Sequence, residues 1–429
     1  MPLLAAVLLS SCSAASVEEL LSPPRLDGEQ SEIYAALRDF TSSDIILKYP
    51  KSGRYRSAFV VRNLDNEPTD EAIVFYEMPN VSDGSSLRLN FLDKHNGVWV
   101  SVYDFAASGS EVENVRFEDL GLGSLTIIVN YLMQSSSDRY TSVMTYTDST
   151  PQELMNIRNI YMDVFDADGN GINDLFTITN ERVSGNTMAG IYGTREGSSL
   201  VQLGFVPLNS GFAGIRSVTC GDCGTPGTHT TFVDYAFPDG SFGTDAVIYG
   251  NKYFYLSPVL NPDITLRISN SYTPYVASAD ADGDGVIEIP TSVPFPGYTD
   301  LPHAEQVNMT VWHSLDRAGT VFSEKLRSFV GTKGDYIFFF PENWGGVTAA
   351  VSISESTVVF NRYDTISDVK GEELLRLYGA ADGNTDRYDN DDYIYLGRSD
   401  TTGFSYYAAL SNSTLTPDAE SLGQLFRLR

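Results

Sequence analysis

Two short stretches of the chain alternate acidic residues and glycines between apolar runs. They read DVFDADGNGINDLF at 163–176 and SADADGDGVIEIP at 278–290. Oxygen ligands at the first, third, fifth, seventh and ninth positions of a loop suit Ca²⁺, a hard cation with flexible coordination. The residues at these positions are Asp166, Asp168, Asn170, Ile172 and Asp174 in one loop, and Asp280, Asp282, Asp284, Val286 and Glu288 in the other. The spacing predicts two structural Ca²⁺ sites, with Ile172 and Val286 contributing backbone carbonyls.

The same spacing opens the calcium loop of an EF-hand, but the rest of that motif is missing. An EF-hand needs a glutamate at the twelfth position and a helix on each side. The twelfth position is Thr177 in one loop and Thr291 in the other, and the flanking residues are β-branched and aromatic. The alternative to a metal site is a solvated acidic turn, in which three close carboxylates would repel one another. We therefore expect strand-to-strand loops that are clamped by an ion.

Related loops recur along the chain and indicate how many elements position these sites. Strand–loop–strand segments have loops starting near Asn63, Glu118, Asp166, Cys220 and Asp280. The first keeps acidic or amide residues at four ligand positions without the glycines. A period of roughly 50–60 residues built from short strands is typical of a propeller or a similar radial array. Apolar hairpins between the loops, such as 87–105, complete four-stranded units. We predict a mainly β chain, a β-propeller of about five or more blades.

These features resemble a known repeat family. Strand, DxDGxGxxD-type loop and strand at this period are similar to the FG-GAP repeat of integrin-α-like, calcium-binding β-propellers, over about residues 45–330. The resemblance implies a propeller at 46–332 with calcium in its acidic loops.

The first residues indicate where the protein works. Residues 1–11 are apolar and too short to span a bilayer, as in a secretory signal. Leu9-Ser10-Ser11-Cys12 resembles a bacterial lipobox, which predicts a lipid on Cys12. Residues 12–45 then form a tether and an amphipathic helix with Ile33, Leu37 and Phe40 on one face. We expect a membrane-anchored lipoprotein of the bacterial cell envelope, on the extracytoplasmic side.

The remaining two cysteines, Cys220 and Cys223, lie close together in TCGDCG. In an oxidising compartment this spacing favours a local disulfide. A thioredoxin-like redox motif would have to open a helix, and a zinc site would need two further ligands, of which His229 is the nearby candidate. The disulfide is our prediction.

The C-terminal part, 333–429, has a different pattern. Strands are expected around 334–344 and 347–362, and GEELLRLYGA at 371–380 and the last residues read as helices. This mixture predicts an α+β module, which faintly resembles PsbP-like domains. FFFPENW at 338–344 could form a sugar-stacking platform through Trp344, but a core strand and its turn is the favoured interpretation.

The net charge and the lack of common catalytic motifs restrict the classes of function that the sequence allows. The formal net charge is -28, which repels nucleic acid and anionic membrane faces. The chain has 4 histidines, none in a metal-ligand or triad pattern, and it contains no GxSxG, HExxH or phosphate-binding loop. We expect a non-enzymatic binding or scaffolding protein for an extracellular protein or glycan, touching the membrane only through its anchor. The alternative is a carbohydrate-active propeller enzyme, a lyase or glycosidase.

Overall fold

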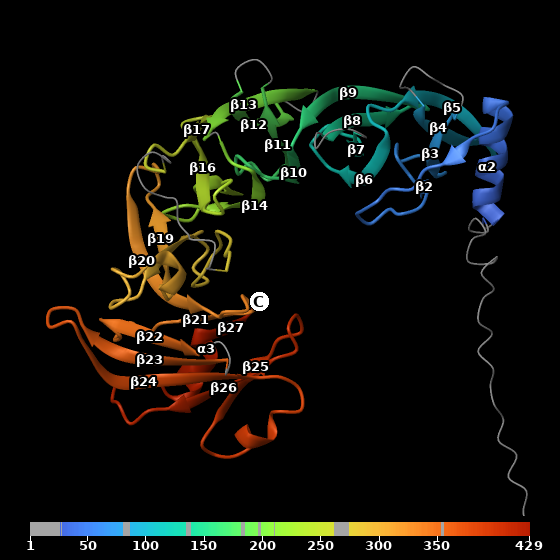
Figure 1. Ribbon diagram of the computed structural model, residues 1–429. Coiled ribbons are helices and arrows are strands. Elements are labelled where there is room, and N and C mark those ends of the chain that lie inside the picture. The colour runs from blue at the N-terminus through green and yellow to red at the C-terminus, as the bar shows by residue number, and fades with distance from the viewer. Residues whose placement is uncertain are drawn as a thin grey trace, which may run out of the picture. The chain divides into compact units, whose positions relative to one another are not determined.

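The protein is described by a computed structural model (Figure 1). Placement is described for residues 26, 28–79, 86–133, 139–181, 185–195, 199–209, 211–260, 274–352 and 356–429. The predicted signal peptide, Cys12 and most of the tether lie outside these residues. Among the described residues, no helix is both long and apolar enough to cross a membrane.

The chain is mainly β and consists of successive antiparallel sheets, numbered here in chain order. Sheet 1 contains β1 (Ile46–Leu47), β2 (Phe59–Arg62), β3 (Glu71–Glu77), β4 (Leu87–His95) and β5 (Val98–Ala106). Sheet 2 contains β6 (Glu111–Glu118), β7 (Thr126–Leu132), β8 (Arg139–Thr147) and β9 (Thr150–Asn159). Sheet 3 contains β10 (Tyr161–Phe165), β11 (Asp174–Asn180), β12 (Thr187–Thr194) and β13 (Leu200–Leu208). Sheet 4 contains β14 (Gly214–Asp222), β15 (His229–Ala236), β16 (Phe242–Gly250) and β17 (Tyr253–Leu256).

Two five-stranded sheets follow. Sheet 5 contains β18 (Ile289–Pro294), β19 (Asn308–Leu315), β20 (Phe322–Val330), β21 (Tyr336–Phe339) and β27 (Phe426–Leu428). Sheet 6 contains β22 (Val347–Ser352), β23 (Thr357–Asp364), β24 (Val369–Ala380), β25 (Ile394–Arg398) and β26 (Ser405–Leu410). The described helices are α2 (Gly28–Thr41), α3 (Ala419–Leu425) and the 3₁₀ turns η2 (His303–Glu305) and η3 (Asp386–Tyr388).

The strand that follows the loop in each of the first four sheets is buried along nearly its whole length. β3, β7, β11 and β15 are buried at most positions, without the alternation of a strand that has one wet face. A strand buried on both faces needs a neighbouring sheet on each side. Sheets 3 and 4 share one core, sheets 4 and 5 a second, and sheets 5 and 6 a third. This series of stacked, blade-like sheets confirms the predicted fold class.

By internal packing the chain forms two compact units. One comprises residues up to Phe117 together with Ile127–Asn156, and the other comprises Glu118–Thr126 together with Ile157–Arg429. In the first unit, α2 buries Ile33 and Leu37 against sheet 1, as the helical pattern predicts. Phe40 remains 52 % exposed, so the apolar face of the helix is narrower than expected.

The C-terminal part differs from its sequence pattern at two places. The helix predicted at 371–380 is wrong, because these residues form β24, which pairs with β23 and β26. Leu374, Leu375 and Leu377 are buried in the core shared by sheets 5 and 6, and this burial outweighs the helical propensity of the segment. The last residues form α3 as predicted, but the chain then continues as β27 beside β21. The expected boundary at 332–333 therefore falls within the β20–β21 hairpin.

Candidate metal centres

The first acidic loop connects β10 to β11 in sheet 3. Phe165 and Asp174 pair directly across the two strands, so residues 166–173 close a hairpin. Carboxylate oxygens of Asp166, Asp168 and Asp174 all lie within 4.8 Å of one another. The structure therefore brings together the three carboxylates that the spacing selected.

The backbone of this loop folds around Asp166. Its Oδ1 accepts hydrogen bonds from the backbone N–H groups of Gly169 (2.7 Å) and Asn170 (3.1 Å), and its Oδ2 accepts one from Gly171 (2.8 Å). Gly169 has a φ of 77°, in the left-handed region that favours glycine. A Cβ at Gly169 would also lie 2.1 Å from the His229 ring. Glycine is thus required at this position for conformation and for space.

Burial makes the negative charge of this loop costly. Asp174 is 1 % exposed and accepts a hydrogen bond from the Ala167 N–H at 3.0 Å. Burial raises the pKa of Asp174 to about 7, and the neighbouring Asp168 and Asp166 add to the rise. Burial likewise raises the pKa of Asp168. A bound divalent cation would remove this penalty by compensating the carboxylates.

The other two predicted ligands, Asn170 and Ile172, form a hydrogen bond with each other within the loop. Asn170 Oδ1 accepts a hydrogen bond from the backbone N–H of Ile172 at 2.7 Å. The Ile172 side chain is a hydrocarbon without a ligand atom, so only its backbone carbonyl is suited to binding an ion. Within the described residues, no lysine or arginine forms an ion pair with Asp166, Asp168 or Asp174.

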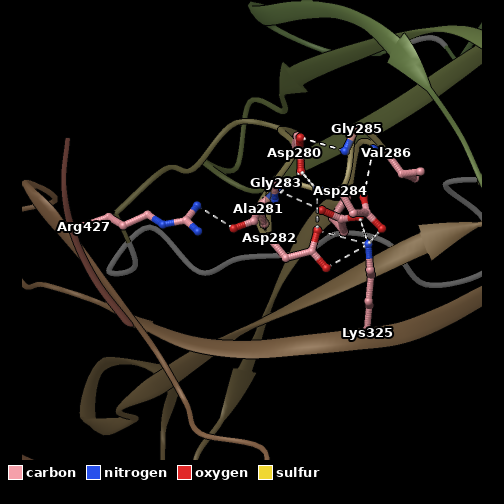
Figure 2. A network of polar contacts seen from close by, with 10 residues as sticks. Asp280, Ala281, Asp282, Gly283, Asp284, Gly285, Val286, Lys325 and Arg427 are labelled. Carbon is pink, nitrogen blue, oxygen red and sulfur yellow. Dashed lines mark hydrogen bonds and ion pairs between the residues drawn. The ribbon is translucent and has the colours of Figure 1, made fainter. Parts of the chain in front are cut away.

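The second acidic loop has the same internal hydrogen bonds (Figure 2). Oxygens of Asp280, Asp282 and Glu288 lie within 4.8 Å of one another. Asp280 accepts from Gly283 (2.6 Å) and Gly285 (3.0 Å), and Glu288 accepts from Ala281 (2.9 Å). The loop leads into β18 of sheet 5. Two loops of equal length and spacing thus adopt one geometry in different blades.

A lysine distinguishes this second loop from the first. Lys325 Nζ, from β20, lies 3.0 Å from Asp282 and 2.7 Å from Asp284 (Figure 2). It also lies 2.8 Å from Glu288. Burial alone would lower the pKa of Lys325, but hydrogen bonds to these three carboxylates raise it overall. Sequence reasoning missed this residue, because nothing near Lys325 in the chain marks it as a partner of a loop in another segment.

The loop at 63 has no glycines, yet it folds in the same way. Leu64 N–H donates to Glu71 Oε2 at 2.7 Å, as Ala167 donates to Asp174 in the first acidic loop. Asn66 has a φ of 65° and takes the conformation that Gly169 has in that loop. Asparagine tolerates the left-handed region better than most residues, which explains how the turn survives.

The buried carboxylate of Glu71 makes the stability of the folded protein depend on pH, and this dependence can be tested. Its side chain is 1 % exposed and its Oε1 has no hydrogen-bond partner. Burial raises the pKa of Glu71 from 4.5 to about 7, with Asp65 and Asp93 contributing. Between these two pKa values the folded state holds more protons than the unfolded state. The free energy of unfolding therefore falls as the pH rises through this window.

Glu71→Gln should weaken this pH dependence. Thermal melts in chelator at pH 5 and pH 8 should show a smaller fall in melting temperature for the variant than for the wild type. Each kcal/mol removed corresponds to roughly 2–4 °C in a domain of this size. Glu67→Gln, on the exposed side of the same loop, is the matched control and should behave as the wild type. An equal fall in all three proteins would contradict the assignment.

The two cysteines do not form the predicted disulfide. Both are free thiols, and Cys223 is fully buried. Cys220 Sγ lies 3.4 Å from the Asp166 carbonyl of sheet 3, whereas Cys223 Sγ lies 3.6 Å from the Asp316 carbonyl of sheet 5. The β14–β15 ladder fixes the backbone between them, so the thiols point to different neighbouring blades. Burial also raises the pKa of Cys220 to about 12, which disfavours the reactive thiolate.

The remaining predicted loop, near Glu118, forms no such centre. Asp119 Oδ1 accepts a hydrogen bond from the Gly121 N–H at 2.8 Å in an exposed turn. In the part of the chain that the structure describes, the clusters of three potential metal ligands are those of the first and second acidic loops.

The comparisons with known proteins do not assign the chain to a family. No family model matches the chain, and no curated protein matches it in sequence. Among solved structures, it is similar to a rhamnogalacturonan lyase from Bacillus licheniformis, with 9% identity, a TM-score of 0.28, and coverage of 89% of this chain and 95% of that chain. It is also similar to an α-L-arabinanase from Penicillium chrysogenum, with 10% identity, a TM-score of 0.26, and coverage of 68% and 91%. At these TM-scores neither likeness carries an argument about function.

Proposed function

We propose that the protein is a calcium-stabilised binding or scaffolding module of the bacterial cell envelope, anchored through a lipid on Cys12. The observation that carries the proposal is the convergence of Asp166, Asp168 and Asp174 within 4.8 Å, without a lysine or arginine among the described residues to compensate them. Such a centre of oxygen ligands suits a divalent cation.

The Ca²⁺ site proposed in this loop uses the three carboxylates, with the Asn170 side chain and the Ile172 carbonyl completing the set. The ion would supply positive charge at the turn between β10 and β11. Because those strands pair on both sides of the loop, the ion would brace the edge of sheet 3. The loop with Asp280, Asp282, Asp284, Val286 and Glu288 is proposed as a second Ca²⁺ site, in which Lys325 competes with the ion.

A binding role follows from how the acidic residues are used. The carboxylates of the first loop accept backbone hydrogen bonds within their own turn, as expected of groups that shape a structural site. With a net charge of -28, the surface suits a protein or glycan partner rather than nucleic acid. The centre therefore stabilises blades whose outer surfaces are available for recognition.

One cavity favours the second candidate function, a carbohydrate-active enzyme. It has a volume of about 560 Å³ and lies beside the second acidic loop. Its lining includes the acidic and aromatic residues Glu324, Glu342, Phe340 and Trp344, together with the basic residues Lys325, Arg327 and Arg427. Carboxylates near aromatic rings are the groups that cleave and hold sugars. However, Trp344 is 3 % exposed and Glu324 is paired with Arg327, so the cavity supports this candidate less well.

The experiment that separates the two candidates presents residues 13–429 to glycan and protein arrays, with Ca²⁺ or with chelator. We expect retention of a partner that is chemically unchanged and is lost when chelator loosens the blades. Cleavage of a polysaccharide, seen as new reducing ends or unsaturated products, would overturn the binding proposal in favour of the enzyme.

The anchor is tested by fractionating a bacterial host. Cys12→Ala should leave the membrane fraction, and unchanged partitioning would contradict lipidation.

A further inference from the structure

Lys325 is placed against the second acidic loop by a specific irregularity of sheet 5. In the β19–β20 pairing, Trp312 is opposite Leu326 and His313 is opposite Glu324, so Lys325 has no partner across the ladder. It is the extra residue of a β-bulge. Bulges redirect a side chain away from the regular alternation of a strand. Here the redirected side chain reaches the acidic loop.

The Lys325 ammonium lies where a cation bound by the second acidic loop would lie. Nζ contacts the third, fifth and ninth ligand positions, Asp282, Asp284 and Glu288, at 2.7–3.0 Å. Figure 2 shows the first two of these contacts. Glu288 is fully buried, and the lysine side chain is 24 % exposed. The first acidic loop has the same hydrogen-bonded frame, and among the described residues it has no lysine in ion-pair contact but has the His229 ring beside Gly169. Among the described residues, an ammonium is therefore supplied from the protein at the second loop and not at the first.

We propose that Lys325 is a built-in counter-cation, which holds the second acidic loop folded without metal and which Ca²⁺ must displace to bind there. This proposal deepens the proposed function and rests on Ca²⁺ being the ion that such loops take. It makes the two loops unequal. The first depends on the external ion, whereas the second has a tethered ammonium that competes with the ion at no cost in translational freedom.

The charge balance explains why competition remains open to Ca²⁺. Lys325 brings one positive charge to three contacting carboxylates, and Asp280 adds a fourth acidic group beside them. A divalent ion would compensate more of this charge than the ammonium does. Buried carboxylates left without a partner are strongly destabilising, so removal of the lysine should create a demand for metal.

The test uses Lys325→Met in an Asp168→Ala background, which silences the first loop, with Lys325→Arg in the same background as the control that keeps the charge. Calorimetry with CaCl₂ should show one site in the Met variant that is at least about tenfold tighter than in the protein with Lys325. In chelator the Met variant should melt several degrees lower, and added Ca²⁺ should restore it. The Arg variant should resemble the Lys325 protein in both respects.

Two outcomes would overturn the proposal. One is an unchanged Ca²⁺ affinity in the Met variant together with an unchanged melting temperature in chelator. The other is a Met variant that remains unfolded both with millimolar Ca²⁺ and after Asp284→Asn removes one of the unpaired charges, since the lysine would then act in packing alone. A failure of the proposed function would be seen in a different experiment. In that case Asp168→Ala, made alone in the otherwise unchanged protein, would not alter the effect of Ca²⁺ on the melting temperature.

Discussion

Addition of millimolar Ca²⁺ to the metal-free protein is expected to raise its melting temperature by roughly 1–6 °C for each site that fills. At about 1–10 times its dissociation constant, a ligand stabilises the folded state by about 0.4–1.4 kcal/mol. One kcal/mol corresponds to roughly 2–4 °C in a domain of this size. Extracellular calcium modules commonly bind at about 10⁻⁴–10⁻³ M. Mg²⁺ should have a much smaller effect, because it demands a tighter octahedral arrangement.

Variants assign this stabilisation to particular carboxylates. Asp168→Ala should remove most of the rise, because Asp168 belongs to the loop that has no lysine. Combination with Asp282→Ala should abolish the rise. Asp119→Ala is the matched control, since Asp119 also accepts a glycine N–H in an exposed acidic turn but belongs to no cluster. A melting curve that neither chelator nor Ca²⁺ moves, with no heat of Ca²⁺ binding in calorimetry, would refute both metal sites.

Phe360→Ala is expected to destabilise the second compact unit by about 3–5 kcal/mol, independently of Ca²⁺. Phe360 is fully buried in the core that sheets 5 and 6 share. Its ring centroid lies 5.7 Å from that of Phe329 in β20 and 5.3 Å from that of Phe338 in β21. Removal of the ring leaves a cavity between the two sheets, so both should lose packing at once.

Thermal melts with and without Ca²⁺ provide the measurement. The melting temperature should fall by roughly 2–4 °C for each kcal/mol, by the same amount in both conditions. Phe360→Leu, which fills most of the space, should show a much smaller fall. If Phe360→Ala and Phe360→Leu both lowered the melting temperature only slightly, the stability of the two sheets would not depend on this ring. That result would contradict the shared core.

Local sequence determined the acidic loops and the strands that flank them. A tight turn around one carboxylate needs glycine or asparagine at a left-handed position, and Gly169 and Asn66 meet this need within their own segments. The buried strands β3 and β7 are visible as apolar runs, whereas β11 and β15 also bury polar residues such as Asp174 and Asp234. The blade-like repeat could therefore be predicted without any knowledge of long-range contacts.

Tertiary structure decided the features that depend on which segments meet. Lys325 reaches the second acidic loop through a bulge, which exists only once β19 and β20 have paired. Cys220 and Cys223 are close in sequence, but the β14–β15 ladder and the adjacent sheets hold their thiols apart. The segment 371–380 carries helix-forming residues and becomes β24, since the strands on both sides of it offer hydrogen bonds and a buried face. In each case the deciding free energy comes from contacts between segments distant in the chain, which local patterns do not encode.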